Sequence, residues 1–403
     1  MGGASSRDQS SNMTFFNQEE VKELKSAYQT GGLEKATSLL QKKVKNLHSA
    51  ELNIAVTGES GAGKSTFVNA MRGLRSCDEG AAKTGNVETT MEPAQYSHPS
   101  LPNVNFWDLP GVGTTKFPTD KYLKKMDFKK YDFFIIIMHN RFKENDAKLA
   151  VEIKRLGKKF YFVRSQIDND LQGAQMAGGN FNTEEELEKI KHDCVTNLEK
   201  AEISSPTVFL ISSYKLDEFD FPALKETLAK SLDDIKKHVF MLSLPSTTWE
   251  IVGKKRQELK KRIWMLATVS GVLGAVPVPG LSFACDIGIL VTAIIDFRHD
   301  LGLDDASLQR LANMTGKPVE DLKAVVKTPL VGEINKDLVT RMFLGSTFVG
   351  IAVAEAIFDF IPVIGSLFGA GSSFAMTYKL LNNALDDLTE NAQKVVKAAF
   401  GTN

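Results

Sequence analysis

The segment "GESGAGKST" at positions 58–66 constrains the fold of this chain more than any other feature. It fits G-x-x-x-x-G-K-[ST] through Gly58, Gly63, Lys64 and Ser65, directly after the strand-like run "LNIAVT" and before the helical pattern "TFVNAMRGL". Its glycines let backbone N–H groups converge on anionic oxygens, and the next helix presents the positive end of its dipole. We therefore predict a strand, a phosphate-binding loop and a helix; a chance glycine-rich turn is the alternative.

The chemistry of a nucleoside triphosphate assigns a task to each residue of this loop. We expect Lys64 to reach the β- and γ-phosphates and the Ser65 hydroxyl to coordinate Mg²⁺. The other loop residues that we predict to bind nucleotide are Gly58, Glu59, Ser60, Gly61, Ala62, Gly63 and Thr66.

Strand-like segments alternate with helical patterns over residues 51–236. The strands read "LNIAV", "VNFWDLP", "YDFFIIIM", "KFYFVRS" and "TVFLIS". Continuous apolar strands such as residues 133–138 are expected where helices cover both faces of a sheet. We predict a doubly wound α/β P-loop domain with a mostly parallel sheet.

The rest of the chain reads as helical. With 403 residues the chain is long enough for two or three domains. We predict a flexible N-terminus over 1–16, two short helices over 17–50 broken at Gly31-Gly32, and long helices over 237–403. The N-terminal and C-terminal segments would together form an all-α domain, with apolar segments at 263–297 and 342–378.

A phosphate loop alone does not choose between ATP and GTP, so other segments must decide. In "FWDLPG", Asp108 stands at a strand end with Gly111 three residues later. The carboxylate is expected to hold Mg²⁺ through water, and the glycine N–H to sense the γ-phosphate. A helix cap or turn role is the alternative for Asp108.

Base recognition is expected after the fifth strand, in "FVRSQIDND". Asp168 can accept two hydrogen bonds from guanine N1–H and the 2-amino group. Ser165 and Gln166 precede it, and Gln166 stands where a lysine usually covers the base, so we expect guanine preference with altered affinity. In "LISSYK", Ser212 and Ser213 follow the next strand, and the Ser213 N–H is expected to meet guanine O6; an ordinary strand-end serine pair is the alternative.

The polar segment "EGAAKTGNVETTME" between these sites suits a switch loop that orders around a triphosphate. Thr84, nineteen residues after Ser65, is the first candidate for the Mg²⁺-sensing hydroxyl. Thr89 and Thr90 remain candidates, and simple loop solvation is the alternative for each.

These phrases together resemble the immunity-related GTPases, the interferon-inducible p47 GTPases. "GESGAGKST", "EGAAKTG", "FWDLPG", "YDFFIII", "KKRQELKKRIW" and "ASLQRLA" match that family in order over nearly the whole chain. The resemblance implies a dynamin-like GTPase of innate immunity that self-assembles when GTP-bound and associates with intracellular or pathogen-vacuole membranes. Its implied partners are a second copy of itself, related GTPases and membranes. It also implies that Glu88 activates hydrolysis in trans, with Thr84 and Thr90 as switch threonines.

The residue after Gly111 is Val112, so no glutamine stands where small GTPases orient the attacking water. We expect slow basal hydrolysis, and a second subunit that brings Glu88 or a backbone carbonyl to complete the site. The alternative is a guanine-nucleotide-gated regulator or scaffold with negligible hydrolysis, for which Gln166 and Val112 leave room.

Membrane attachment is suggested by both ends of the sequence. Gly2 with Ser6 fits the myristoylation pattern, and a disordered polar tail is the alternative. The uncharged runs 263–285 and 360–378 are either membrane-inserting hairpins or buried helices. We read the basic run at 254–262 as a solvated helix face in preference to a lipid head-group contact. We expect a cytoplasmic protein, peripherally associated with membranes.

Composition excludes several classes. The 49 basic and 49 acidic residues cancel, which removes the electrostatic case for nucleic acid. Cys77, Cys194 and Cys285 show no CxxC spacing, and the histidines form no HExxH pattern. Neither a disulfide framework nor a zinc site is therefore expected, and Mg²⁺ with GTP is the expected cofactor.

Overall fold

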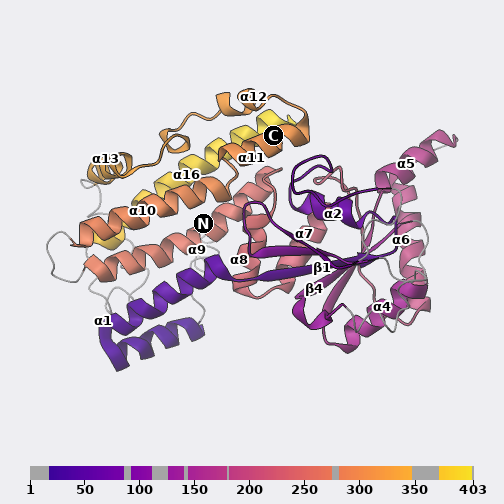
Figure 1. Ribbon diagram of the computed structural model, residues 1–403, viewed down its shortest axis with the longest axis horizontal. Helices are drawn as coiled ribbons and strands as arrows, with labels where there is room; N and C mark the ends of the chain where they lie inside the picture. Colours follow the sequence, from indigo (N-terminus) through magenta and orange to yellow (C-terminus); the bar gives the residue numbers. More distant parts are fainter. Residues whose placement is uncertain are drawn as a thin grey trace, which may run out of the picture. The chain divides into compact units, whose positions relative to one another are not determined.

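The computed structural model describes residues 18–85, 92–110, 126–139, 144–178, 181–274, 281–346 and 372–401. Figure 1 shows the course of the chain. It divides into two compact units. The first consists of Met1–His48, Val252–Asp304 and Lys323–Val395, and the second of Ser49–Ile251, Asp305–Leu322 and Val396–Asn403.

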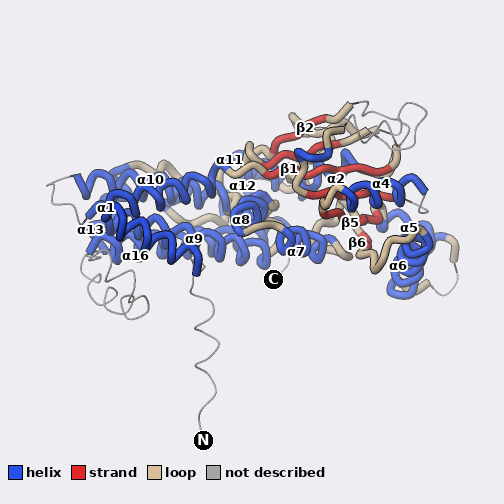
Figure 2. The backbone as a smooth tube through the Cα atoms, turned by 90° about the horizontal axis from the view of Figure 1, so that it is seen from below, coloured by secondary structure: helices blue, strands red, loops and turns tan. Residues whose placement is uncertain are grey.

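The second unit contains one six-stranded sheet in the order β2-β3-β1-β4-β5-β6 (Figure 2). Only β2 runs antiparallel to its neighbour; the other pairs are parallel. The predicted doubly wound, mostly parallel sheet is thus confirmed. The strands are β1 Leu52–Gly58, β2 Ala94–Ser97, β3 Val104–Asp108, β4 Phe133–Met138, β5 Lys159–Arg164 and β6 Val208–Leu210.

Strand register determines which residues meet at the carboxyl edge of the sheet. Val56 of β1 pairs with Asp108, the last residue of β3, and on its other side with Ile135 of β4. Arg164, the last residue of β5, pairs with Leu210, the last of β6. The segments that follow β1, β3, β5 and β6 therefore leave the sheet at one edge, where doubly wound folds bind ligands.

Helices cover both faces of this sheet, which explains its uniformly apolar strands. Side chains alternate along each strand, so Ile54 and Val56 join one core and Ala55 the other. On one face pack α2 Lys64–Met71, α7 Phe221–Ser231 and α8 Asp234–Ser243. On the other pack α4 Glu144–Arg155, α5 Ile167–Met176 and α6 Thr183–Lys200, near the short turn η1 Phe128–Lys130.

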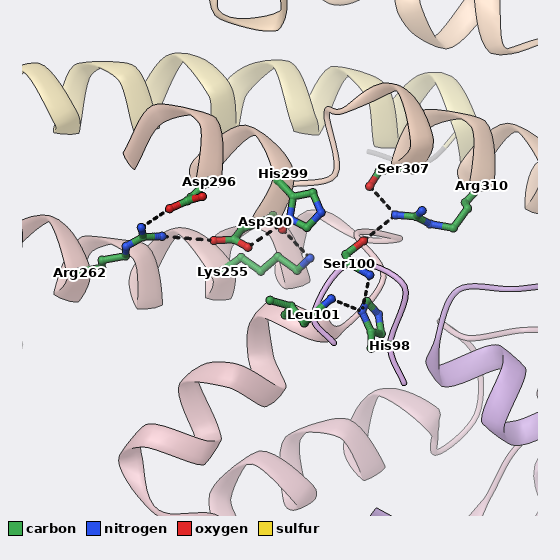
Figure 3. Close-up of polar contacts among 10 residues, drawn as sticks. All are labelled: His98, Ser100, Leu101, Lys255, Arg262, Asp296, His299, Asp300, Ser307 and Arg310. Carbon is green, nitrogen blue, oxygen red and sulfur yellow. Dashed lines mark hydrogen bonds and ion pairs between the residues drawn. The ribbon is translucent and has the colours of Figure 1, made fainter. Parts of the chain in front are cut away.

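Two later segments of the chain also belong to this unit. Arg310 of α11 (Asp305–Thr315) donates to the Ser100 hydroxyl in the β2–β3 turn at 2.7 Å (Figure 3). Lys317 donates to the carbonyl of Ala398 at 2.5 Å. The sheet domain is therefore built from three separate stretches of sequence.

The first unit is all-helical. It contains α1 Gln18–Ser49, most of α9 Trp249–Gly274, α10 Leu281–Asp300, α13 Lys336–Ser346 and most of α16 Ser372–Phe400, with part of α12 Val319–Ala324 and the turn η2 Pro329–Val331. The predicted break at Gly31-Gly32 is confirmed, because both residues leave helical backbone angles. An ion pair of 3.2 Å between Glu23 and Lys43 shows that the two halves of α1 lie side by side.

The basic run at 254–262 is not the solvated face that we predicted. Lys255, Glu258 and Arg262 follow helical spacing and are buried. Arg262 pairs with Asp296 of α10, and Lys255 donates to the Asp300 carbonyl at 2.8 Å (Figure 3). Carboxylates on α10 thus compensate charges that the local sequence places on the inner side of α9.

The described part of the apolar segment at 263–297 packs inside the helical unit. Trp264 lies against Phe374 of α16, and the buried hydroxyls of Ser270 and Thr377 are 2.9 Å apart. Among the described residues, no helix is both long and apolar enough to span a membrane. Gly2 and residues 275–280 and 360–371 of the two uncharged runs lie outside the described ranges.

Candidate nucleotide-binding site

The phosphate loop joins β1 to α2 through backbone conformations that favour glycine. Gly58, Gly61 and Gly63 have φ angles of 133°, 79° and 88°. A Cβ on Gly58 would lie 2.0 Å from the carbonyl oxygen of Ile137, so only glycine fits there. Ser60 and Gly61 are exposed, and the mouth of the loop therefore faces solvent.

Lys64 is buried within this loop, with 7% of its surface exposed. Its ammonium group donates to the carbonyl oxygens of Glu59 at 2.7 Å and Gly58 at 3.3 Å. These contacts hold a compact positive charge at the start of the loop, beside the N-terminus of α2. Phosphate oxygens are the natural ligands of such an arrangement.

Ser65 and Asp108 meet directly beside Lys64. The Ser65 hydroxyl donates to Asp108 Oδ2 at 2.5 Å, and Asp108 is 1% exposed. A hydroxyl and a carboxylate are oxygen ligands of the kind that Mg²⁺ prefers, usually with waters and substrate phosphates. The pair therefore fits a magnesium ion that arrives with a nucleotide, and these two residues would hold it.

The segment after β5 crosses to the phosphate loop. Ser165 Oγ donates to the Ala62 carbonyl at 2.6 Å, and Gln166 Nε2 donates to the Gly61 carbonyl at 3.3 Å. Gln166 adopts a left-handed backbone with φ of 61° at the start of α5. The loop and the predicted base-recognition segment are thus in direct contact, and the partly exposed Asp168 follows in the first turn of α5.

The segment after β6 runs alongside the segment after β5. Ile211 donates its N–H to the Arg164 carbonyl at 2.9 Å and accepts from the Ile167 N–H at 3.2 Å. Ser212 is fully buried, and its hydroxyl accepts from the Tyr214 N–H at 3.2 Å. This turn leaves the neighbouring Ser213 partly exposed next to the segment that carries Asp168.

A charged cluster lies next to the predicted base-recognition segment and was not identified from the sequence. Arg164 is 5% exposed and contacts Asp170 at 2.5 Å and His139 at 3.1 Å. Burial and then the Arg164 guanidinium lower the pKa of His139. Burial raises the pKa of Asp170, and Arg164 opposes that change. The signal available was a polar residue at the end of two apolar strands: His139 directly after β4, and Arg164 as the last residue of β5.

The remaining predicted residues divide into two groups. Thr84 is described and exposed, and within the described ranges it makes no hydrogen bond to the phosphate loop. Outside the described ranges lie Glu88, Thr89, Thr90, Gly111 and Val112. The structure therefore brings together the loop, Asp108, the segment at 165–168 and the serines at 212–213.

Other chemistry finds little support in the described part of the chain. No group of three or more His, Cys, Asp or Glu side chains there could hold a metal ion. Cys77 is exposed, Cys194 is buried, and both are free thiols. Burial raises the pKa of the Cys194 thiol to about 11, which keeps it protonated and unreactive.

The strand order and this loop define a G domain, the nucleotide-binding domain of P-loop GTPases. Residues 17–399 match the family described as "Interferon-inducible GTPase (IIGP)". The chain belongs to the interferon-inducible GTPase family.

Curated relatives agree over most of their length. Interferon-inducible GTPase 5 of Rattus norvegicus is 40% identical over 378 residues, covering 94% of this chain and 82% of the relative. Interferon-gamma-inducible GTPase 10 of Mus musculus is 40% identical over 385 residues, covering 95% and 89%. T-cell-specific guanine nucleotide triphosphate-binding protein 2 of Mus musculus is 41% identical over 366 residues, covering 89% and 85%.

Solved G domains show lower sequence identity to this chain. The FeoB G-domain from Methanococcus jannaschii is 19% identical with a TM-score of 0.27, covering 46% of this chain and 99% of that domain. Toc33 from Arabidopsis thaliana, solved with Mg²⁺ and GMPPNP, is 14% identical with a TM-score of 0.31, covering 46% and 82%.

Proposed function

We propose that this interferon-inducible GTPase hydrolyses GTP to GDP and phosphate with Mg²⁺, and that pairing of two copies stimulates the reaction. The observation that carries the proposal is the contact of 2.5 Å between Ser65 and Asp108 beside the buried ammonium of Lys64. It supplies metal ligands and a phosphate-binding cation at one point of the sheet edge.

Each of these groups has a defined task in the proposed reaction. Phosphoryl transfer is catalysed mainly by positioning and by stabilising negative charge. Lys64 and the loop amides hold the β- and γ-phosphates, and Ser65 with Asp108 holds the metal. When bound, Mg²⁺ neutralises charge on the phosphate oxygens. We assign Thr84 to the same site in the GTP state, as a further oxygen ligand of the metal.

Guanine is the proposed base. Asp168 would accept from guanine N1–H and the 2-amino group, which adenine cannot match. Gln166 supports this arrangement because its amide already spans from the base segment to the Gly61 carbonyl. The Ser213 N–H would meet guanine O6. A relative at 41% identity carries the name guanine nucleotide triphosphate-binding protein, in agreement with this choice.

The proposed self-assembly is supported by the sequence, which has no glutamine at the position that orients the attacking water in small GTPases. Val112 occupies the place where a glutamine orients water in small GTPases. We propose that a second copy, or a related GTPase, docks on the nucleotide face and that Glu88 acts across the pair. Assembly in the GTP state would then accelerate the slow basal hydrolysis of the single chain.

Intracellular or pathogen-vacuole membranes are the proposed place of action. The acylation pattern at Gly2 supports this, because one acyl chain gives marginal, reversible attachment that assembly can strengthen. Gly2→Ala should move the protein from the membrane to the soluble fraction of a cell extract. Unchanged membrane association would contradict acylation as the attachment.

The main test is nucleotide turnover with GTP and ATP over a dilution series of the protein. We expect GTP to be consumed, ATP to be spared, and specific activity to rise with protein concentration. Lys64→Ala should abolish turnover, whereas Lys189→Ala, on the exposed face of α6, should not. A flat concentration profile would contradict pairing, and turnover that survives Lys64→Ala would contradict the site.

A further inference from the structure

Asn69 of α2 pairs with the backbone of Ala82 in both directions. Its amide nitrogen donates to the Ala82 carbonyl at 2.9 Å, and the Ala82 N–H donates to its amide oxygen at 2.7 Å. Asn69 is 1% exposed and Ala82 is fully buried. The side chain thus satisfies both backbone groups of a residue that belongs to no helix or strand.

Arg72, at the C-terminal end of the same helix, holds the chain two residues earlier. Its Nη1 donates to the Gly80 carbonyl at 3.0 Å, and its Nε donates to the Ser97 carbonyl at 3.1 Å. Ser97 is the last residue of β2. Arg72 therefore ties the segment around Gly80 to the sheet edge as well as to α2.

Tyr96 of β2 adds a third contact. The Arg72 guanidinium lies 5.4 Å from the centre of its ring. Burial and then the nearby Asp108 carboxylate raise the pKa of the Tyr96 hydroxyl, while a hydrogen bond from the backbone of Lys83 lowers it. This hydrogen bond links the Tyr96 hydroxyl to the residue just before Thr84.

We propose that Asn69, Arg72 and Tyr96, here called the clasp, are positioning residues for GTP hydrolysis. They fix the chain up to Lys83, so that Thr84 extends from a defined point. The proposal rests on the function proposed above, in which Thr84 serves the magnesium and triphosphate site.

The location of the clasp on α2 gives it this effect. α2 begins at Lys64 and Ser65, and Asn69 lies little more than one turn further along. The helix that holds the phosphates and the metal therefore also holds the origin of the Thr84 segment. A displacement of one relative to the other is limited by two hydrogen bonds of normal length.

Conformational entropy explains why the clasp should matter for turnover. Ordering a free residue costs backbone conformational entropy, so a segment already fixed to Lys83 has fewer positions to order. This advantage is used only when Thr84 has a γ-phosphate and its metal to serve. Weakening the clasp should therefore lower kcat with GTP and leave GDP affinity unchanged.

The test compares Asn69→Ala, Asn69→Asp and Tyr96→Phe in the full chain. We expect Asn69→Ala to lower kcat about tenfold, as loss of two hydrogen bonds implies, with Kd for GDP within about twofold. Asn69→Asp keeps the acceptor for the Ala82 N–H but places a second carboxylate oxygen against the Ala82 carbonyl oxygen, so its kcat should be no higher than that of Asn69→Ala. Tyr96→Phe keeps the ring against Arg72 and should lower kcat about threefold without affecting folding.

Hydrogen exchange provides a direct second measurement. In the GDP-bound protein the Ala82 amide should exchange at least about tenfold faster in Asn69→Ala, while the amides of α2 keep their protection.

Asn391→Ala is the matched control, because Asn391 is equally buried, accepts from the Lys327 N–H and donates to the Asp387 carbonyl, both at 2.8 Å. Tyr161→Phe is the control for Tyr96→Phe.

The outcomes separate this proposal from the proposed function. If the unchanged chain hydrolyses no GTP, both fail. If it hydrolyses GTP and the Asn69 and Tyr96 variants keep its kcat, only the clasp fails. A fall in GDP affinity that parallels the fall in kcat would also overturn the positioning role, because the variants would then act by general loss of structure.

Discussion

The side-chain amide of Gln166 donates to the carbonyl oxygen of Gly61 at 3.3 Å. The contact joins the proposed base-recognition segment to the phosphate loop through a neutral group, at a position where related motifs carry a lysine. It indicates that bridging the two segments requires a donor at the end of a long stem and does not require a positive charge.

Removing this bridge should weaken nucleotide binding. We expect Gln166→Ala to raise Kd for GDP about three- to tenfold, since one hydrogen bond contributes about 0.5–1.5 kcal/mol. Gln166→Lys retains a donor and an apolar stem and should bind at least as tightly as the unchanged chain. Titration with fluorescent GDP measures both, with Gln172→Ala, exposed on α5, as control. Equal affinities for Gln166→Ala and the unchanged chain would refute the role of the bridge.

Gly58→Ala should unfold the start of the phosphate loop. The added Cβ would lie 2.0 Å from the Ile137 carbonyl oxygen, so β1 and β4 must move apart. Gly157 also has a positive φ, of 68°, but its Cβ would meet open space, so Gly157→Ala should cost only about 1 kcal/mol. Gly58→Ala should lower Tm more than Gly157→Ala does, and it should abolish GDP binding. Equal shifts in Tm would contradict the close approach.

Stability should fall in mild acid through His139. Its pKa is lowered in the folded protein from an ordinary value of 6.5, so the unfolded chain binds a proton first as the pH falls through that value. The free energy of unfolding should therefore decrease between about pH 7.5 and pH 5.5. Denaturant titrations of His139→Gln should show a smaller decrease, whereas His192→Gln, exposed on α6, should retain it. An unchanged pH dependence in His139→Gln would exclude this group as the cause.

The ion pair between the buried Arg262 and the partly exposed Asp296 should be more costly to break than to replace. Asp296→Ala removes the nearer carboxylate and leaves the buried Arg262 guanidinium with the more distant Asp300, at 3.8 Å, and should lower the free energy of unfolding by about 2–4 kcal/mol. Arg262→Met combined with Asp296→Leu removes the charges of this pair but leaves the buried Asp300 carboxylate, so it should cost less than Asp296→Ala without being neutral. Urea unfolding monitored by helix content measures both variants; equal losses would contradict the prediction that an unpaired Arg262 charge is the main cost of Asp296→Ala.

Local pattern was sufficient to predict most of the sheet. The strands around Val56, Asp108, Ile135, Val163 and Leu210 were all expected, because each is a short apolar run ending at polar or glycine residues. β2 was missed, since its four residues "AQYS" alternate weakly and pair only at the sheet edge. Its antiparallel pairing with β3 depends on a contact that no local signal encodes.

In the candidate site, too, the local motif was predicted from the sequence and the long-range contacts were not. The phosphate loop is a contiguous motif, and the sequence therefore located it residue by residue. The contacts of Ser165 and Gln166 with that loop join residues more than one hundred positions apart. Such contacts depend on the parallel order of β1, β4 and β5, so neither their partners nor their distances could be predicted.

The prediction of a solvated basic face on α9 was wrong for a physical reason. A run with many lysines and arginines is usually solvated, because burying an unpaired charge is costly. Here Asp296 and Asp300 pair with Arg262, and both lie more than thirty positions further along the chain. The cost is offset by partners that become visible only when α9 and α10 are packed together.

The contact between Lys317 and Ala398 bears on how this GTPase can be dissected. The G domain takes α11 and the last residues of the chain from beyond the helical segments, so a recombinant fragment ending near residue 236 would omit parts of its own packing. Proteolytic trimming or a tag fused at the C-terminus would act first on the nucleotide-binding unit, although the neighbouring sequence is helical.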